Sequence, residues 1–217
     1  MADVERYLPR LSISTVLDVG ANVGQSAEVY RAAWPEADLW CVEPVSSTFE
    51  ALLDHTADDA RIHCFRLALG RTDGGVVHVT TGRRSTSNRV VDDEAEAAEE
   101  PREPVPMRTG DAFCAEHGIE HVNLCKVDTE GLDLEVVAGF GQMLEAQAID
   151  LLQVEAGLNP TNTAHVDLTR FRDLLEPLGY RLFYLYDQVL GFRGVPHLRR
   201  ANPAFVSARV VEDNTGM

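Results

Sequence analysis

Four acidic residues stand where short apolar runs end. Asp18 lies in "TVLDVG", Glu43 ends "LWCVE", and Asp128 and Glu155 end "NLCKVD" and "LLQVE". A carboxylate in such a position can hold a cation, accept hydrogen bonds from hydroxyl groups or act as a general base. These acids, with the turns that follow them, are the candidate chemical residues of the chain.

The turn after the first apolar run differs from the dinucleotide fingerprint G-x-G-x-x-G. It reads "GANVG", so Asn22 stands where close approach of the backbone to a pyrophosphate requires glycine. Gly20 and Gly24 still permit a tight turn, and Asn22 supplies an amide. Asp18 would repel a pyrophosphate and attract an ammonium group. The turn therefore favours a ligand with a zwitterionic amino-acid end.

Glu43 adds a second requirement on the ligand. It lies 23 positions after Gly20, and an acid roughly 20 residues beyond the glycine turn accepts hydrogen bonds from ribose hydroxyls. S-adenosylmethionine has both a ribose and an amino-acid end, so we expect it as the cofactor. Two alternatives remain: an ordinary strand-to-helix turn, and a nicotinamide-dependent oxidoreductase.

Two predicted buried strands become polar toward their carboxyl ends. Lys126 and Asp128 share one face of a strand, and Gln153 and Glu155 share one face of the next. We expect Asp128 and Glu155 to lie close together, either supplying a general base or holding a divalent metal that hard oxygen ligands would make magnesium. If the ammonium of Lys126 reaches Asp128, it makes that carboxylate a weaker base but a good metal ligand.

Less specific interpretations apply to the same residues. Lys126 can pair with Asp128 or Glu135 purely as structural support. Glu130 starts a predicted helix, where an acid is favourable whatever the function. His165, in "GLNPTNTAHVD", is the histidine best placed to act as a base.

The elements that position these residues alternate between apolar strands and amphipathic helices. This pattern predicts a doubly wound, mostly parallel seven-stranded sheet with an antiparallel last strand. Strands are expected at residues 15–19, 38–43, 61–69, 121–128, 149–156, 181–186 and 204–211, and helices at residues 25–34, 46–55, 132–147 and 167–178. Residues 76–80 are expected to form a hairpin with the third strand after the turn at residues 73–75.

Residues 83–107 interrupt this alternation. Within them, residues 92–103 hold seven acids and one base, which is typical of a solvated loop. The preceding "RRSTSN" belongs to a loop longer than about 15 residues, and such loops are often lids over a site. We expect residues 1–217 to form a single domain with a mobile lid or acidic loop at residues 83–107.

Composition excludes several partner classes. A net charge of −16 on 217 residues opposes binding to nucleic acid and to anionic membranes. No apolar run approaches the roughly 18 residues of a membrane helix, and "MADVERYLPR" lacks the features of a signal peptide. The four cysteines have no C-x-x-C spacing and are expected to be reduced. The sequence thus predicts a cytoplasmic protein with no nucleic acid partner and no membrane insertion.

Several motifs in order resemble the FkbM family of S-adenosylmethionine-dependent O-methyltransferases. They are "VLDVGANVGQS", "CVEP", "LALG", "STSN", "LCKVDTEGLDLEVVAG" and "LLQVEA", over about residues 15–184. The most specific is K-x-D-x-E-G, which begins at Lys126. Residues 92–103 and the tail after Asp187 match nothing in the family, so acceptor choice is least determined there.

The resemblance implies a class I methyltransferase fold and a division of the cofactor site. Asp18, Gly20, Asn22 and Gly24 would surround the methionine moiety, Glu43 would bind the ribose, and Ala68 and Leu69 would lie against adenine. It further implies a homodimer and a hydroxyl acceptor on a sugar, oligosaccharide or glycolipid, or alternatively on a polyketide or macrolide.

The acceptor and the activity stay open at this point. Phe183, Tyr184, Tyr186 and Phe192 could stack on a sugar, although a core or dimer-surface role is the favoured interpretation for most of them. A catalytically silent S-adenosylmethionine-binding module is the alternative from another functional class.

Overall fold

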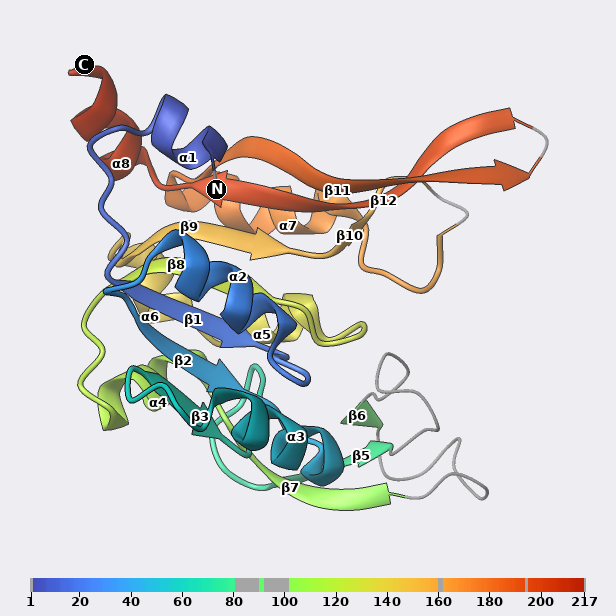
Figure 1. Ribbon diagram of the computed structural model, residues 1–217. Helices are drawn as coiled ribbons and strands as arrows, with labels where there is room; N and C mark the ends of the chain where they lie inside the picture. Colours follow the sequence, from blue (N-terminus) through green and yellow to red (C-terminus); the bar gives the residue numbers. More distant parts are fainter. Residues whose placement is uncertain (1, 81–89, 92–101, 160–161, 194, 217) are drawn as a thin grey trace.

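The computed structural model describes residues 2–80, 90–91, 102–159, 162–193 and 195–216 (Figure 1). Its main sheet has the strand order β10-β12-β9-β8-β1-β2-β3, with β11 paired to β12. The strands are β1 (Thr15–Val19), β2 (Asp38–Val42), β3 (Ile62–Phe65), β8 (Val122–Val127), β9 (Ile149–Val154), β10 (Ala156–Gly157), β11 (Arg181–Arg193) and β12 (Val195–Val206).

The directions of these strands confirm the predicted doubly wound sheet. β3, β2, β1, β8 and β9 run parallel to one another. β12 is antiparallel to β9 and to β11, so the sheet closes with an antiparallel strand inserted beside β9. The two-residue β10 adds a short strand beyond the seven expected.

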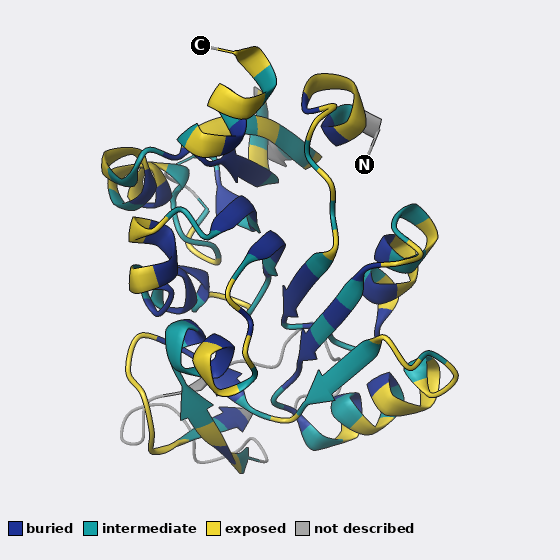
Figure 2. Ribbon diagram, turned by 90° about the vertical axis from the view of Figure 1, so that its left-hand side faces the viewer, coloured by how far each residue is buried: buried dark blue, intermediate teal, exposed yellow. Residues whose placement is uncertain are grey.

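Helices cover both faces of the main sheet. One face carries α2 (Gln25–Ala33) and α3 (Ser46–Thr56), with α1 (Ala2–Tyr7) and α8 (Ala208–Thr215). The other carries α4 (Gly110–Glu116), α5 (Asp133–Ala138), α6 (Gly141–Glu145) and α7 (Leu168–Leu175), which a short 3-10 turn at Glu176–Leu178 extends. In Figure 2 the strands are mostly buried and the helices turn exposed residues outward.

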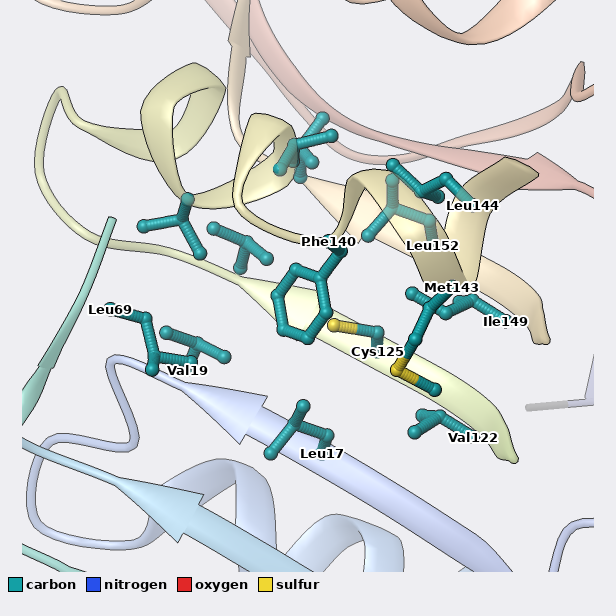
Figure 3. Packing of buried hydrophobic residues seen from close by; sticks show 14 of the residues in the cluster. Leu17, Val19, Leu69, Val122, Cys125, Phe140, Met143, Leu144, Ile149 and Leu152 are labelled. Carbon is teal, nitrogen blue, oxygen red and sulfur yellow. The ribbon is translucent and has the colours of Figure 1, made fainter. Parts of the chain in front are cut away.

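Alternation along the strands divides the core between the two faces. In β1, Leu17 and Val19 pack on the face of α4 to α7, whereas Val16 packs on the opposite face. Phe140 and Cys125 lie in the first of these clusters (Figure 3). Because every buried strand contributes to both clusters, its register also fixes which polar side chains emerge at its end.

A second, four-stranded sheet corrects two predictions. It contains β4 (Ala68–Leu69), β7 (Arg102–Arg108), β5 (Val76–Thr80) and β6 (Val90–Val91) in that order. β5 is therefore not a hairpin partner of the third main-sheet strand but an antiparallel partner of β7 and β6. Val79 and Val105 are buried together with Val45 and Ala68, which explains the pairing.

The prediction of a loop at residues 83–107 is consequently wrong at its carboxyl end, because residues 102–108 form β7. The two prolines flanking Val105 and the surrounding charges concealed this strand in the sequence. The lid expected at "RRSTSN" and most of the acidic segment lie outside the described residues.

The remaining differences concern element ends. The helix expected at residues 132–147 is broken into α5 and α6 near Gly139, where an added Cβ would lie 2.1 Å from the carbonyl oxygen of Gly70. The last strand ends at Val206, and Ser207 caps α8 by accepting a hydrogen bond from the backbone N–H of Val210. Neither α1 nor α4 was predicted. Among the described helices, none has the length and apolar character needed to cross a membrane.

Candidate cofactor and active site

A pocket of about 260 Å³ opens at the carboxyl ends of β1, β2 and β8. This is the edge at which open parallel sheets bind their ligands. Its wall combines the glycine turn, the acid after β2, the apolar β4 region and the segment after β8. The lining residues include Gly20, Asn22, Gln25, Ser26, Glu43, Val45, Ala68, Leu69, Val79, Lys126, Asp128, Thr129, Glu130 and Leu132.

The glycine turn is held tightly against two strand ends. Gly20 has a φ of +83°, and a Cβ added to it would lie 2.0 Å from the carbonyl oxygen of Asp128. The backbone N–H of Gly20 donates to the carbonyl of Val42 at 2.9 Å, and that of Asp128 donates to Val19 at 2.9 Å. Gly24, with a φ of +96°, starts α2. Only glycine meets both the dihedral and the spacing at position 20.

Asn22 supports the turn from within. Its φ is +52°, a left-handed conformation that asparagine tolerates better than most residues. Its side-chain oxygen accepts a hydrogen bond from the backbone N–H of Val23 at 2.8 Å. The side-chain amide of Asn22 thus lies at the pocket, and its oxygen accepts a hydrogen bond within the turn.

Glu43 is buried and pre-oriented by the backbone. One of its oxygens accepts from the N–H of Asn22 at 3.0 Å and the other from the N–H of Val45 at 2.9 Å. Burial raises the pKa of Glu43, and these two backbone donors oppose that rise. Each carboxylate oxygen keeps a second lone pair for a ligand hydroxyl.

Asp18, Lys126 and Asp128 form a charged row at the pocket, and Lys126 and Asp128 belong to its lining. The Lys126 ammonium lies 3.4 Å from one oxygen of Asp18 and 3.2 Å from Asp128. Burial lowers the pKa of Lys126, but the two carboxylates raise it more, so the net shift is upward. The expected contact of Lys126 with Asp128 is present, whereas Glu135 pairs instead with Arg71.

Asp18 lies deeper than the sequence indicated. Its side chain is only 1% exposed, and it is not among the residues lining the pocket. Its second oxygen has no hydrogen-bond partner within the described part of the chain. Burial raises the pKa of Asp18, an effect that Lys126 opposes. Its nearest cation is therefore Lys126 of the same chain.

Glu155 is not paired with Asp128 as the sequence led us to expect. One of its oxygens contacts Arg200 of β12, and the other lies 2.9 Å from Nε2 of His165. Nδ1 of His165 lies 3.0 Å from the side-chain oxygen of Asn162. Both carboxylate oxygens of Glu155 and both ring nitrogens of His165 are engaged.

This arrangement does not supply the metal ligands predicted at Asp128 and Glu155. Among the described residues, no group of three or more histidine, cysteine or acidic side chains is arranged to hold a metal ion. The structure therefore gives no support to magnesium, and His165, whose ring nitrogens face the oxygens of Asn162 and Glu155, is not among the residues that line the cofactor pocket. Burial and the Arg199 guanidinium also lower the pKa of His165 and so weaken it as a base.

The segment after β8 contributes residues that the sequence left without a clear role. Glu130 lines the pocket with a φ of +53°, and burial together with Asp128 raises its pKa. Asp133, buried at the start of α5, accepts from the N–H groups of Thr129 and Gly131, both at 3.2 Å, and so fixes this segment. Burial raises the pKa of Asp133 to about 6. The K-x-D-x-E-G motif indicated that this segment belongs to the site, but the spacing of its residues did not predict the conformation of the turn.

Two curated proteins are similar to this chain in sequence. The 2-O-methyltransferase NoeI of Sinorhizobium fredii is 25% identical over 142 residues, which are 59% of this chain and 58% of that protein. The hexuronic acid methyltransferase AglP of Haloferax volcanii is 24% identical over 151 residues, 66% of this chain and 56% of that protein. The chain spans little more than half the length of either relative.

Solved structures and family comparison agree on the fold. The crystal structure of magnesium protoporphyrin IX methyltransferase (ChlM) from Synechocystis with bound SAM aligns with a TM-score of 0.51 at 10% identity, covering 95% of this chain and 77% of that one. It supports the class I methyltransferase fold and nothing finer. The family described as "Methyltransferase FkbM domain" matches residues 18–182. The chain therefore belongs to the FkbM methyltransferase family.

Proposed function

We propose that the protein is an S-adenosylmethionine-dependent O-methyltransferase that acts on a hydroxyl of a carbohydrate-containing acceptor. The observation that carries the proposal is a single pocket in which the Gly20 turn, the Glu43 carboxylate and the Asp128 segment meet. Membership of the FkbM methyltransferase family supports the same reaction class.

The lining residues fit the parts of S-adenosylmethionine. Glu43 presents acceptor lone pairs to ribose hydroxyls, and Val45, Ala68, Leu69 and Val79 offer an apolar wall for adenine. The turn at Gly20 brings backbone close to the methionine end. The unpartnered oxygen of Asp18 adds negative charge behind that turn, which favours an ammonium group nearby.

When bound, the cofactor would supply an electrophilic methyl group, and the chain's task is to place the acceptor hydroxyl and take its proton. Asp128 is the acid best placed for this, because it lines the pocket and its side chain is 35% exposed. The Lys126 ammonium lies 3.2 Å from one Asp128 oxygen, a contact that orients the carboxylate for this role and would equally suit the metal-ligand alternative. Glu155 and His165 are engaged with each other and act, if at all, by shaping the rim.

The carbohydrate acceptor draws support from the names of the two relatives. One is named a hexuronic acid methyltransferase and the other a 2-O-methyltransferase. A polyketide or macrolide hydroxyl is the alternative acceptor, and magnesium held by Asp128 is the alternative means of activating it. The homodimer expected from the family resemblance remains a prediction, which light scattering can test.

The test is methyl transfer from isotopically labelled S-adenosylmethionine to a panel of sugars, glycolipids and macrolides. Release of S-adenosylhomocysteine with labelling of a carbohydrate is the expected result. Cofactor binding without transfer to any member of the panel would favour a silent binding module. Binding of NADH without binding of S-adenosylmethionine would overturn the proposal.

Glu43→Gln is expected to weaken S-adenosylmethionine binding by roughly ten- to 150-fold, measured by titration calorimetry. This corresponds to about 1.5–3 kcal/mol for loss of a charge-assisted hydrogen bond to ribose. Glutamine keeps an oxygen for one of the two backbone donors and turns its amide NH2 toward the other, a local cost that should leave the fold intact. Glu50→Gln, at an exposed position of α3, is the matched control and should bind normally.

The pH dependence of binding provides a second readout. Because burial raises the pKa of Glu43, its carboxylate takes up a proton at a higher pH than an ordinary glutamate with a pKa of 4.5. The protonated form loses acceptor strength, so affinity should fall as the pH falls through this raised pKa. Glu43→Gln should lose that dependence; an unchanged profile in the variant would show that another acid binds the ribose.

A further inference from the structure

A second cavity, of about 370 Å³, adjoins the cofactor pocket on the α1 and α2 face of the main sheet. Its volume lies within the range of about 300–1,000 Å³ typical of small-molecule sites. Gln25, Ser26 and Lys126 line both cavities. The two spaces therefore meet at the start of α2 and the end of β8, beside Asp128.

The floor of the second cavity is polar where a sheet face is normally apolar. Lys126 and Gln153 are register partners on β8 and β9, and both line the cavity. Leu124 and Leu151, two residues earlier on the same strands, are buried hydrophobic residues. These leucines line the same cavity, so its floor changes from apolar to polar along the two strands.

Two polar atoms of residues that line this cavity are buried and have no partner within the described part of the chain. They are the hydroxyl oxygen of Tyr186 and the side-chain oxygen of Asn202. Tyr186 and Asn202 are register partners on β11 and β12, and the Asn202 amide nitrogen donates to Asp187 at 2.9 Å. A buried polar atom without a partner is unfavourable unless a ligand or water supplies one. The pair therefore indicates a ligand with hydroxyl groups.

Aromatic rings complete the wall. Tyr30 of α2 and Trp34, the residue that follows α2, line the cavity with their rings stacked at 20° and 6.0 Å between centroids, and Phe183 lies in the same lining. Rings beside hydrogen-bonding groups suit a ligand with one apolar face and several hydroxyls.

The charges in the cavity bear on which sugar would fit. Among the lining residues that the structure describes, Lys126 is the basic one, and it already lies between Asp18 and Asp128. Asp187 adds a carboxylate. A negatively charged hexuronate would meet this carboxylate without an unpaired cation to offset it, whereas a neutral sugar would not.

We propose that this second cavity binds the acceptor as a neutral sugar ring, with Tyr186 and Asn202 hydrogen-bonding its hydroxyls and the shared wall at Lys126 presenting one hydroxyl to Asp128. The inference rests on the proposed function and gives it a location and a substrate class.

The test compares Tyr186→Phe with Tyr184→Phe. The first removes only the unpartnered hydroxyl, and the second makes the same change two residues away at a side chain that is 40% exposed and outside the cavity lining. The probes are neutral methyl hexopyranosides and glucuronate, added to the protein with S-adenosylhomocysteine and followed by saturation-transfer NMR and titration calorimetry.

We expect a neutral glycoside to bind more tightly than glucuronate, and Tyr186→Phe to weaken it roughly two- to tenfold while Tyr184→Phe leaves it unchanged. Asn202→Ala should act in the same direction as Tyr186→Phe. S-adenosylhomocysteine affinity should be equal in all variants. Tighter binding of glucuronate, equal effects of the two tyrosine variants, or no glycoside binding to the cofactor-loaded protein would overturn the inference. Failure of the parent protein to bind S-adenosylhomocysteine would instead overturn the proposed function.

Discussion

Gly20→Ala should eliminate measurable cofactor binding and lower the free energy of unfolding by about 2–5 kcal/mol. An alanine at a φ of +83° costs roughly 1–2 kcal/mol. The added Cβ would also lie 2.0 Å from the carbonyl oxygen of Asp128, a backbone atom that cannot rotate away. Relief requires the turn and the end of β8 to separate, and both line the cofactor pocket.

Gly74→Ala is the matched control for this prediction. Gly74 has nearly the same φ, +80°, but an added Cβ would meet nothing within 4 Å. It should therefore show only the conformational cost and bind S-adenosylhomocysteine like the parent. Urea denaturation and titration calorimetry measure both quantities. Equal losses in the two variants would mean that the close approach at Gly20 has no energetic consequence.

The pocket beside Gly20 was largely predictable because it depends on local sequence. A strand, a tight turn and a helix are consecutive in the chain, so the sequence around Asp18, Gly20 and Gly24 is sufficient to predict the local geometry of the turn. Glu43 follows from the next strand by the same rule. The period of two placed Lys126 and Asp128 on one face, and their ammonium and carboxylate groups are 3.2 Å apart.

The surroundings of Glu155 were not predictable, because they depend on a distant strand. Arg200 reaches Glu155 only because β12 is antiparallel to β9, a register that no local pattern specifies. The sequence predicted polar residues at the end of β9 but not that their charges would be met from β12. β7 was missed for a related reason, since Val105 becomes a core residue only against β5 and β4.

The depth of Asp18 illustrates a further limit. The sequence placed Asp18 in the first strand, where it shares a face with Lys126 across the register of β1 and β8. The sequence did not show that this carboxylate would be buried, with Lys126 of the same chain as its nearest cation. The spacing of residues along a strand specifies the face on which a side chain lies, whereas its burial depends on the elements that pack against that face.

Asp128→Asn should reduce kcat by about 10²- to 10⁴-fold, the usual contribution of a general base, with little loss of stability. Asparagine keeps the shape of the side chain and removes the proton-accepting charge. Lys126 would still lie 3.4 Å from Asp18, so no buried ammonium is left without a carboxylate. Steady-state methyl transfer, urea denaturation and S-adenosylhomocysteine titration separate these quantities.

Glu130→Gln is the comparison that assigns the proton to Asp128. Glu130 lines the same pocket, and its raised pKa makes it the alternative acceptor. We expect this variant to lose less than about tenfold in kcat, because Glu130 lacks a partner such as Lys126 to orient it, at least among the contacts of the described residues. A larger loss in Glu130→Gln than in Asp128→Asn would transfer the role to Glu130.

A chelator then distinguishes a base from a metal ligand at Asp128, since either role makes the residue essential. Both oxygens of Glu155 are engaged by Arg200 and His165, which leaves Asp128 without the second carboxylate that a metal site at this rim would use. Parent activity should therefore persist in excess EDTA, with the loss in Asp128→Asn unchanged by added magnesium. Activity abolished by EDTA and restored by magnesium would require Glu155 to leave its partners and would make Asp128 a metal ligand. Unfolding of Asp128→Asn would assign the residue to structural support of Lys126.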